Sequence, residues 1–276
     1  MPEELKSMFA HYYGNHVSAA PKSRICLKLF IDPIAPVEVY RHLGYPREAA
    51  PAPGIAKRIA QIVSETQPTL RPRGAYALYA VSNRTSHSLE LNGTRISGNF
   101  GEYLDRAERV AVFVVTVGEE ISHFAKSAAK NNDAFSAWVM DAVGSCAVEA
   151  SAEALTTIVR SHLQDREGLT LRCSPGYCGM HINQQRKLFQ LVQAGALGVT
   201  LMPSMGMHPV KSISGIVGLA PKESVRHYRS PCDRCARTEC SMRRFVAEHE
   251  AGPGDLIREQ YSQTPVRGRY SSQSAI

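Results

Sequence analysis

The turn at residues 172–177 holds the side chains best suited to binding a small ligand. It reads RCSPGY, and its Pro-Gly pair predicts a tight turn that presents backbone N–H and C=O groups at close range. Arg172 can hold a carboxylate through two parallel hydrogen bonds, and Tyr177 can stack on a ligand or donate a hydrogen bond. An ordinary turn between a strand and a helix explains the same residues, and on the turn alone it is the simpler interpretation.

Three cysteines lie close together near the C-terminus, in the pattern Cys232-x2-Cys235-x4-Cys240. The chain has seven cysteines, an odd number, and in a reducing compartment disulfides explain them poorly. Thiolates at this spacing favour a metal, either a structural zinc ion or an iron–sulfur cluster, and the spacing does not decide between the two. A four-thiolate site needs one more ligand, for which Cys178 is the first candidate and Cys173 the second. Three unliganded surface thiols are the alternative.

The order of motifs over residues 140–220 resembles a known family. A helical segment reading VEASAEAL ends at Leu155, the RCSPGY turn follows, and a later segment reads M-x-M-x-P-x-K-S-x-S-G up to Gly215. This succession resembles the activation domain of cobalamin-dependent methionine synthase, which binds S-adenosylmethionine. That domain carries an R-x-x-P-G-Y turn between a helix with an A-E-A segment and a Ser-x-Ser-Gly strand. The resemblance extends over about residues 25–220.

The resemblance implies a role for each matching residue. Glu149 matches the helix carboxylate that contacts the amino-acid part of S-adenosylmethionine, and Arg172 matches the arginine that holds the ligand's carboxylate. Ser174 stands where the family often has alanine, and its backbone would contact the ligand. Gly176 and Tyr177 end the turn and would line the ligand and the mouth that faces cobalamin, which makes Tyr177 the candidate catalytic residue. Without the turn, a solvated helix face would be the simpler interpretation of Glu149.

The implied function is reductive activation of a corrinoid (cobalamin) methyltransferase system, which returns cob(II)alamin on a partner protein to the methylated state. The full methionine synthase also carries homocysteine, folate and cobalamin modules. None of them fits beside the matched region in 276 residues, so we expect a free-standing relative that acts on a separate corrinoid protein. A zinc-stapled S-adenosylmethionine-binding module without redox activity is the alternative.

The implied reaction also bears on the metal. Because the reduction needs an electron path, the resemblance favours an iron–sulfur cluster over zinc at Cys178, Cys232, Cys235 and Cys240. A low-potential donor such as ferredoxin or flavodoxin would supply the electron.

Helices and strands that alternate along the chain must position these residues. A continuous apolar, β-branched run predicts a central strand over residues 109–117, and Asn92-Gly93 predicts a hairpin turn. Asp133 begins a long helix that runs to about His162 and carries Glu149. We therefore expect an α+β fold with a twisted, largely antiparallel sheet. The expected parts are an N-terminal arm (1–24), an activation-like domain (25–220), a cysteine-rich metal-binding segment (221–250) and a disordered tail (251–276).

Composition limits the class of protein. Hydrophobic residues make up 43% and charged residues 21%, which is typical of a soluble globular protein. The longest dense apolar run, Val110–Val117, is far shorter than the roughly 20 residues of a membrane span. The N-terminus has no apolar signal region, so we expect a cytoplasmic protein without a membrane anchor. A net charge of +7 with a single Trp does not indicate a dedicated nucleic-acid binder. An acidic protein partner explains the basic surface at least as well.

Overall fold

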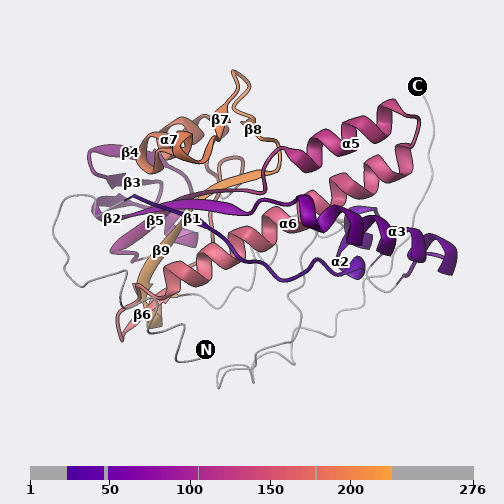
Figure 1. Cartoon of the computed structure of the whole chain (residues 1–276). Helices are drawn as coiled ribbons and strands as arrows, with labels where there is room; N and C mark the ends of the chain where they lie inside the picture. The colour runs from indigo at the N-terminus through magenta and orange to yellow at the C-terminus, as the bar shows by residue number, and fades with distance from the viewer. Residues whose placement is uncertain (1–23, 47–48, 105, 178, 226–276) are drawn as a thin grey trace, which may run out of the picture. The chain divides into compact units, whose positions relative to one another are not determined.

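The computed structural model describes residues 24–46, 49–104, 106–177 and 179–225. These residues form a sheet with helices on both faces (Figure 1). The helices are α2 (Pro36–His42), α3 (Pro53–Thr66), α4 (Phe100–Tyr103), α5 (Glu120–Lys130), α6 (Ala134–Arg160) and α7 (Gln185–Val192). Short 3-10 helices are η1 (Gln67–Thr69), η2 (Ile182–Gln184), η3 (Ala194–Leu197) and η4 (Lys222–Ser224).

The main sheet has seven strands, and every strand pair in it is antiparallel, as predicted. Its order is β4-β3-β2-β5-β9-β6, and β1 pairs with the first residues of β2. A second, two-stranded sheet pairs β7 with β8. The strands are β1 (Ile25–Lys28), β2 (Arg73–Thr85), β3 (Ser88–Leu91), β4 (Thr94–Ser97), β5 (Arg109–Thr116), β6 (Glu167–Leu169), β7 (Thr200–Leu201), β8 (Met207–His208) and β9 (Ser212–Pro221).

Strand β5 lies at the centre of the sheet, between β2 and β9, and its residues are buried from Val110 onward. Its odd-numbered residues from Ala111 to Val115 join the apolar cluster that includes α6, and its even-numbered residues from Val110 to Val114 join the cluster that includes α7. Figure 1 shows α6 and α7 on opposite faces of the sheet. Both faces of the strand are therefore covered, which explains its continuous apolar sequence.

Helix α6 is the main support of one face of the sheet. Asp133 caps its first turn: the Asp133 side chain accepts hydrogen bonds from the Ser136 backbone N–H at 3.0 Å and from the Ser136 hydroxyl at 2.7 Å. By length and composition alone α6 could span a membrane, but 61% of its most apolar window is buried inside the fold. Helix α6 is thus a core helix of this fold.

Three local features concern a hairpin turn, a short strand and two cysteines. The β3–β4 hairpin turns at Asn92 (φ 48°) and Gly93 (φ 74°), the two positive φ angles of the type I′ turn that Asn-Gly favours. Strand β7 is limited to Thr200 and Leu201, because η3 and the left-handed Gly198 (φ 73°) precede it. Cys146 is buried, whereas Cys26 is exposed on β1, where side chains alternate between the two faces.

Candidate ligand site between helix α6 and the 172–177 turn

The 172–177 turn is fixed by backbone hydrogen bonds on both sides. Cys173 pairs with Ile216 of β9 through two bonds of 2.9 and 2.8 Å. The Tyr177 N–H donates to the Ser174 carbonyl at 2.9 Å, with Pro175 and a left-handed Gly176 (φ 93°) between them. Pro followed by a positive-φ Gly is the pattern of a type II turn. The predicted tight turn is confirmed, and it is anchored to a buried strand.

Gly215 of β9 allows the turn to approach the sheet this closely. A Cβ atom on Gly215 would lie 2.8 Å from the Cys173 carbonyl oxygen, 2.9 Å from the Phe113 ring and 2.9 Å from the Ser174 hydroxyl. The glycine of the Ser-x-Ser-Gly segment therefore makes room for the turn residues. Sequence reasoning gave Gly215 no such role, although a glycine inside a strand often indicates a close backbone approach.

The turn places Arg172 against α6, where it meets two carboxylates. The Arg172 Nη2 atom lies 3.1 Å from Glu153 Oε2, within hydrogen-bond distance, and 3.6 Å from Glu149 Oε2. The Arg172 side chain is 19% exposed, that of Glu149 34% and that of Glu153 69%. Glu149 and Arg172, which the sequence motifs paired, thus lie side by side. Glu153 was not among the predicted site residues, although it stands one helical turn after Glu149.

A polar stripe runs along α6 beside the site. Asp141, Ser145, Glu149 and Glu153 recur every four residues, so they share one face of the helix. At the far end of the stripe the Lys211 ammonium contacts Asp141 Oδ1 at 2.8 Å and the Ser145 hydroxyl at 2.9 Å. Lys211 is buried and directly precedes β9. The contact fixes the helix next to β9, the strand with which the turn pairs.

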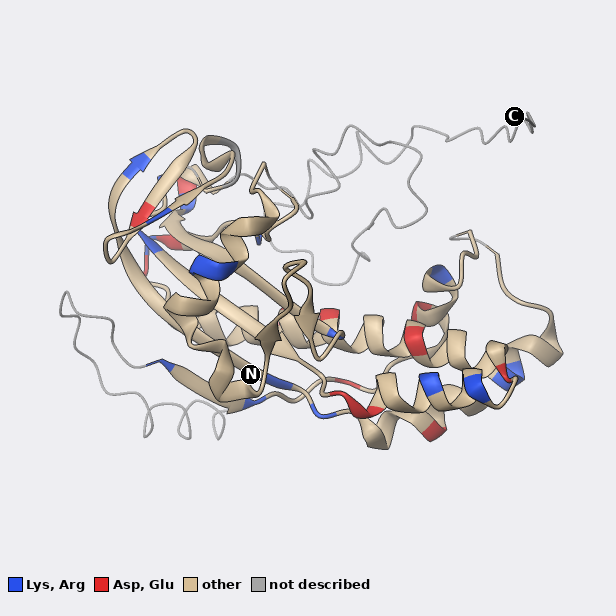
Figure 2. Ribbon diagram, turned by 90° about the horizontal axis from the view of Figure 1, so that it is seen from above, with Lys and Arg blue, Asp and Glu red and all other residues tan. Residues whose placement is uncertain are grey.

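Charged residues are sparse in the middle of the sheet, as Figure 2 shows. Helix α6 carries only four of them in 27 residues, and three of these four belong to the polar stripe. The fold therefore concentrates the charge of this helix on the face next to Arg172. Opposite charges placed on rigid, half-buried elements suit a small zwitterionic ligand, which needs an anion and a cation at a fixed separation.

The other predicted site residues differ in exposure. Ser174 is partly buried beside Gly215, and Gly176 and Tyr177 are exposed. The Tyr177 side chain is 70% exposed, so its ring is available to a ligand or a partner protein. The turn thus joins a half-buried polar end at Arg172 to an open apolar end at Tyr177.

The predicted metal ligands Cys178, Cys232, Cys235 and Cys240 lie outside the described residues. Cys173, the second candidate for the fourth ligand, is fully buried in the apolar cluster that includes α7. Within the described ranges no three His, Cys, Asp or Glu side chains come together as a metal site would require.

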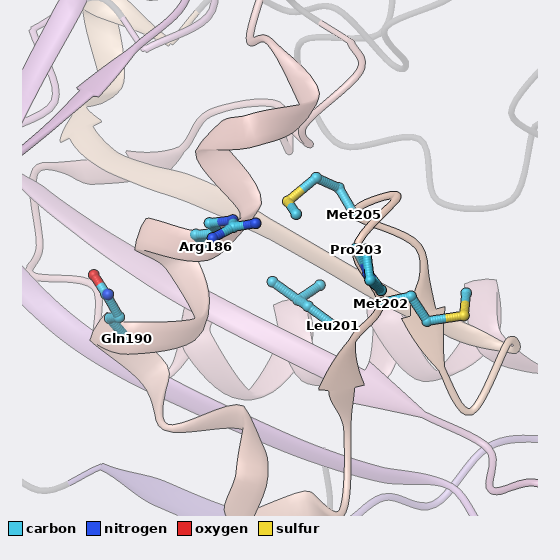
Figure 3. Close-up of a pocket in the computed structure, with 6 residues that line it drawn as sticks. All are labelled: Arg186, Gln190, Leu201, Met202, Pro203 and Met205. Carbon is cyan, nitrogen blue, oxygen red and sulfur yellow. The ribbon is translucent and has the colours of Figure 1, made fainter.

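A separate shallow pocket of about 460 Å³ opens between α7 and the segment that follows β7 (Figure 3). Arg186 and Gln190 line it from α7, and Leu201, Met202, Pro203 and Met205 line it from the other side. None of these residues belongs to the Glu149–Arg172 cluster. The pocket is therefore not the site that the sequence motifs indicate.

Comparisons with known proteins agree with the motifs and the fold. A family model described as the activation domain of vitamin B12-dependent methionine synthase matches residues 101–230. A crystal structure of the MetH reactivation domain bound to AdoHcy is similar, with a TM-score of 0.56 and 16% sequence identity over 77% of this chain and 82% of that one. No curated protein matches the sequence. In its motifs and in its fold, this chain resembles the activation domain of vitamin B12-dependent methionine synthase.

Proposed function

We propose that this protein binds S-adenosylmethionine between α6 and the 172–177 turn and takes part in the reductive activation of a cobalamin-dependent methyltransferase. One observation carries the proposal: the anchored turn holds Arg172 beside Glu149 at 3.6 Å. The ligand has an α-carboxylate that needs a cation and an α-ammonium that needs an anion. One solved structure similar to this chain has AdoHcy bound, the demethylated form of the same ligand.

The proposed reaction has two steps on a corrinoid partner. A low-potential donor such as reduced ferredoxin or flavodoxin gives one electron to cob(II)alamin and yields cob(I)alamin. The methyl group of S-adenosylmethionine then moves to cobalt, and the electron pair of the broken C–S bond stays on sulfur as S-adenosylhomocysteine.

Residues of this chain bind and orient the methyl donor. Arg172 and Glu149 hold its amino-acid part, and the backbone at Ser174 and Gly176 borders the ligand. Tyr177, with a 70% exposed side chain, contacts the corrinoid protein at the reacting end.

The cysteine-rich segment is proposed to complete the electron path. Cys178 directly follows Tyr177 in sequence, so a four-thiolate cluster of Cys178, Cys232, Cys235 and Cys240 would lie beside the ligand end of the turn. An iron–sulfur cluster there would relay the electron, whereas zinc would only staple the segment. The reducing conditions that the cluster and cob(I)alamin need are those of the cytoplasm.

Loss of the cob(II)alamin electron paramagnetic resonance signal tests the activity. A cobalamin-loaded corrinoid protein is mixed anaerobically with reduced flavodoxin and S-adenosylmethionine. We expect this protein to accelerate the loss of the signal, Arg172→Ala to abolish the acceleration, and Glu65→Gln to retain it. Glu65 is a suitable control because it is an exposed glutamate that accepts a hydrogen bond from Gln61. A rate that is the same with and without the protein would contradict the proposal.

A further inference from the structure

In the structure the guanidinium of Arg172 contacts two carboxylates. Its Nη2 atom makes a 3.1 Å hydrogen bond to Glu153 and lies 3.6 Å from Glu149. The single positive charge of Arg172 therefore attracts two carboxylates, which are one helical turn apart and repel each other. An incoming carboxylate that binds the same nitrogen of Arg172 has to compete with the two glutamates for it.

The two carboxylates differ in how easily they can withdraw. The Glu153 side chain is 69% exposed, so water solvates it as soon as it rotates away from Arg172. The Glu149 side chain is only 34% exposed and keeps more of its contact with the protein. Glu153 also makes the shorter of the two contacts with Nη2, at 3.1 Å against 3.6 Å for Glu149. Of the two carboxylates, Glu153 can therefore move away from Arg172 more easily.

We propose that Glu153 occupies Arg172 until the ligand binds and competes with the ligand's α-carboxylate for it. The inference rests on the proposed S-adenosylmethionine site and adds a residue that sets its affinity. On binding, the ligand carboxylate replaces Glu153 at Arg172, and the α-ammonium of the ligand lies against Glu149. Glu153 is thus a positioning residue that holds Arg172 in place at the cost of affinity.

Isothermal titration with S-adenosylhomocysteine tests this role directly. This ligand carries no sulfonium charge, so removing the charge of Glu153 acts mainly through Arg172. Because an exposed ion pair contributes little, we expect Glu153→Gln to tighten binding by about two- to fivefold. Glu65→Gln, the matched control, leaves the affinity unchanged.

Two further titrations separate competition from a general change in the protein. 5′-Methylthioadenosine lacks the amino-acid group, so its affinity should be the same in the wild type and in Glu153→Gln. In the Arg172→Ala background, Glu153→Gln should bring no gain for either ligand. A loss of thermal stability alone would move all of these affinities together and would not produce this pattern.

The outcomes distinguish this inference from the proposed function. If the wild type binds S-adenosylhomocysteine, Arg172→Ala loses binding, and Glu153→Gln binds equally or more weakly, the competition is refuted while the site stands. If Glu153→Gln tightens 5′-methylthioadenosine to the same degree, the effect does not act through the α-carboxylate, and the inference is again refuted. If the wild type binds neither S-adenosylmethionine nor S-adenosylhomocysteine, the proposed function fails and the inference fails with it.

Discussion

Two arginines of this protein, Arg172 and Arg109, are held in half-buried surroundings, where ion pairs are screened less than on the open surface. Arg172 is 19% exposed and faces the candidate ligand site. Arg109 is 18% exposed, pairs with Glu167 and donates a 2.9 Å hydrogen bond to the His162 carbonyl. Arg172 can exchange its carboxylate partner for a ligand. Arg109 instead connects the segment that follows α6 to the sheet.

The surroundings of His162 predict a dependence of stability on pH. Burial, and then the positive charge of Arg109, lowers the pKa of His162 below its usual value of about 6.5. The unfolded chain therefore takes up a proton on this histidine at a higher pH than the folded protein does. The stability associated with neutral His162 is complete above about pH 6.5 and declines as the pH falls below that value.

Urea unfolding at pH 7.5, 6.5 and 5.5 measures this effect. His162→Gln removes the titrating group and keeps a polar partner for the Tyr76 hydroxyl, which lies 2.8 Å from His162 Nε2. We expect the wild type to lose more stability than His162→Gln across this range. Equal losses in the two proteins would show that His162 does not contribute.

Among the elements, β9 has the largest influence on the candidate site. It lies beside the central strand β5, it pairs with the turn through Ile216, and Lys211 directly before it reaches α6. The position of Arg172 relative to Glu149 therefore depends on contacts in the middle of one strand and directly before it. A change in β9 should alter the site even when it touches no ligand-binding side chain.

Gly215→Ala tests this dependence. The added methyl group would meet the Cys173 backbone at 2.8 Å, and backbone moves less readily than a side chain. We expect the free energy of unfolding to fall by about 1–3 kcal/mol and the affinity for S-adenosylhomocysteine to fall as well, as measured by urea unfolding and by titration.

Gly54→Ala is the control for Gly215→Ala, because a Cβ atom on Gly54 has no neighbour within 4 Å in helix α3. This variant should be neutral or slightly stabilising. Wild-type stability and affinity in Gly215→Ala would mean that the close approach of the turn is unimportant.

The features that could be predicted from the sequence are those that neighbouring residues determine. The Asp133 cap, the Asn92-Gly93 turn and the buried strand β5 each follow from a short pattern. The Arg172–Glu149 pair was predicted through resemblance to a family, because nothing local relates two residues 23 positions apart. The hydrogen bond from Arg172 to Glu153 and the role of Gly215 depend on how the turn sits against α6 and β9. Such tertiary placement leaves no separate signal in one sequence.

For the whole molecule, the sheet divides the fold into an α6 side and an α7 side. The Glu149–Arg172 cluster belongs to the α6 side, and the pocket at Arg186 lies against α7. The exposed Tyr177 marks the end of the turn at which a corrinoid partner would approach. The cysteine-rich segment would have to reach this same end for an electron relay to function.

Anaerobic purification of the full chain, followed by metal and sulfide analysis, tests the relay. We expect iron with acid-labile sulfide and a broad visible absorption from thiolate–iron charge transfer. Cys240→Ser should lose the absorption while S-adenosylhomocysteine still binds. Zinc without iron would refute the relay and favour an accessory module that binds the ligand without redox chemistry.

The central claim is that Arg172 and Glu149 bind the amino-acid part of S-adenosylmethionine. Isothermal titration of S-adenosylmethionine into the wild type, Arg172→Ala and the Glu65→Gln control tests it most directly. Hydrogen bonds to charged groups contribute about 1.5–3 kcal/mol, so we predict that Arg172→Ala binds roughly ten- to a hundredfold more weakly while the control binds like the wild type. Equal affinity in the wild type and Arg172→Ala, with both proteins folded, would contradict the account.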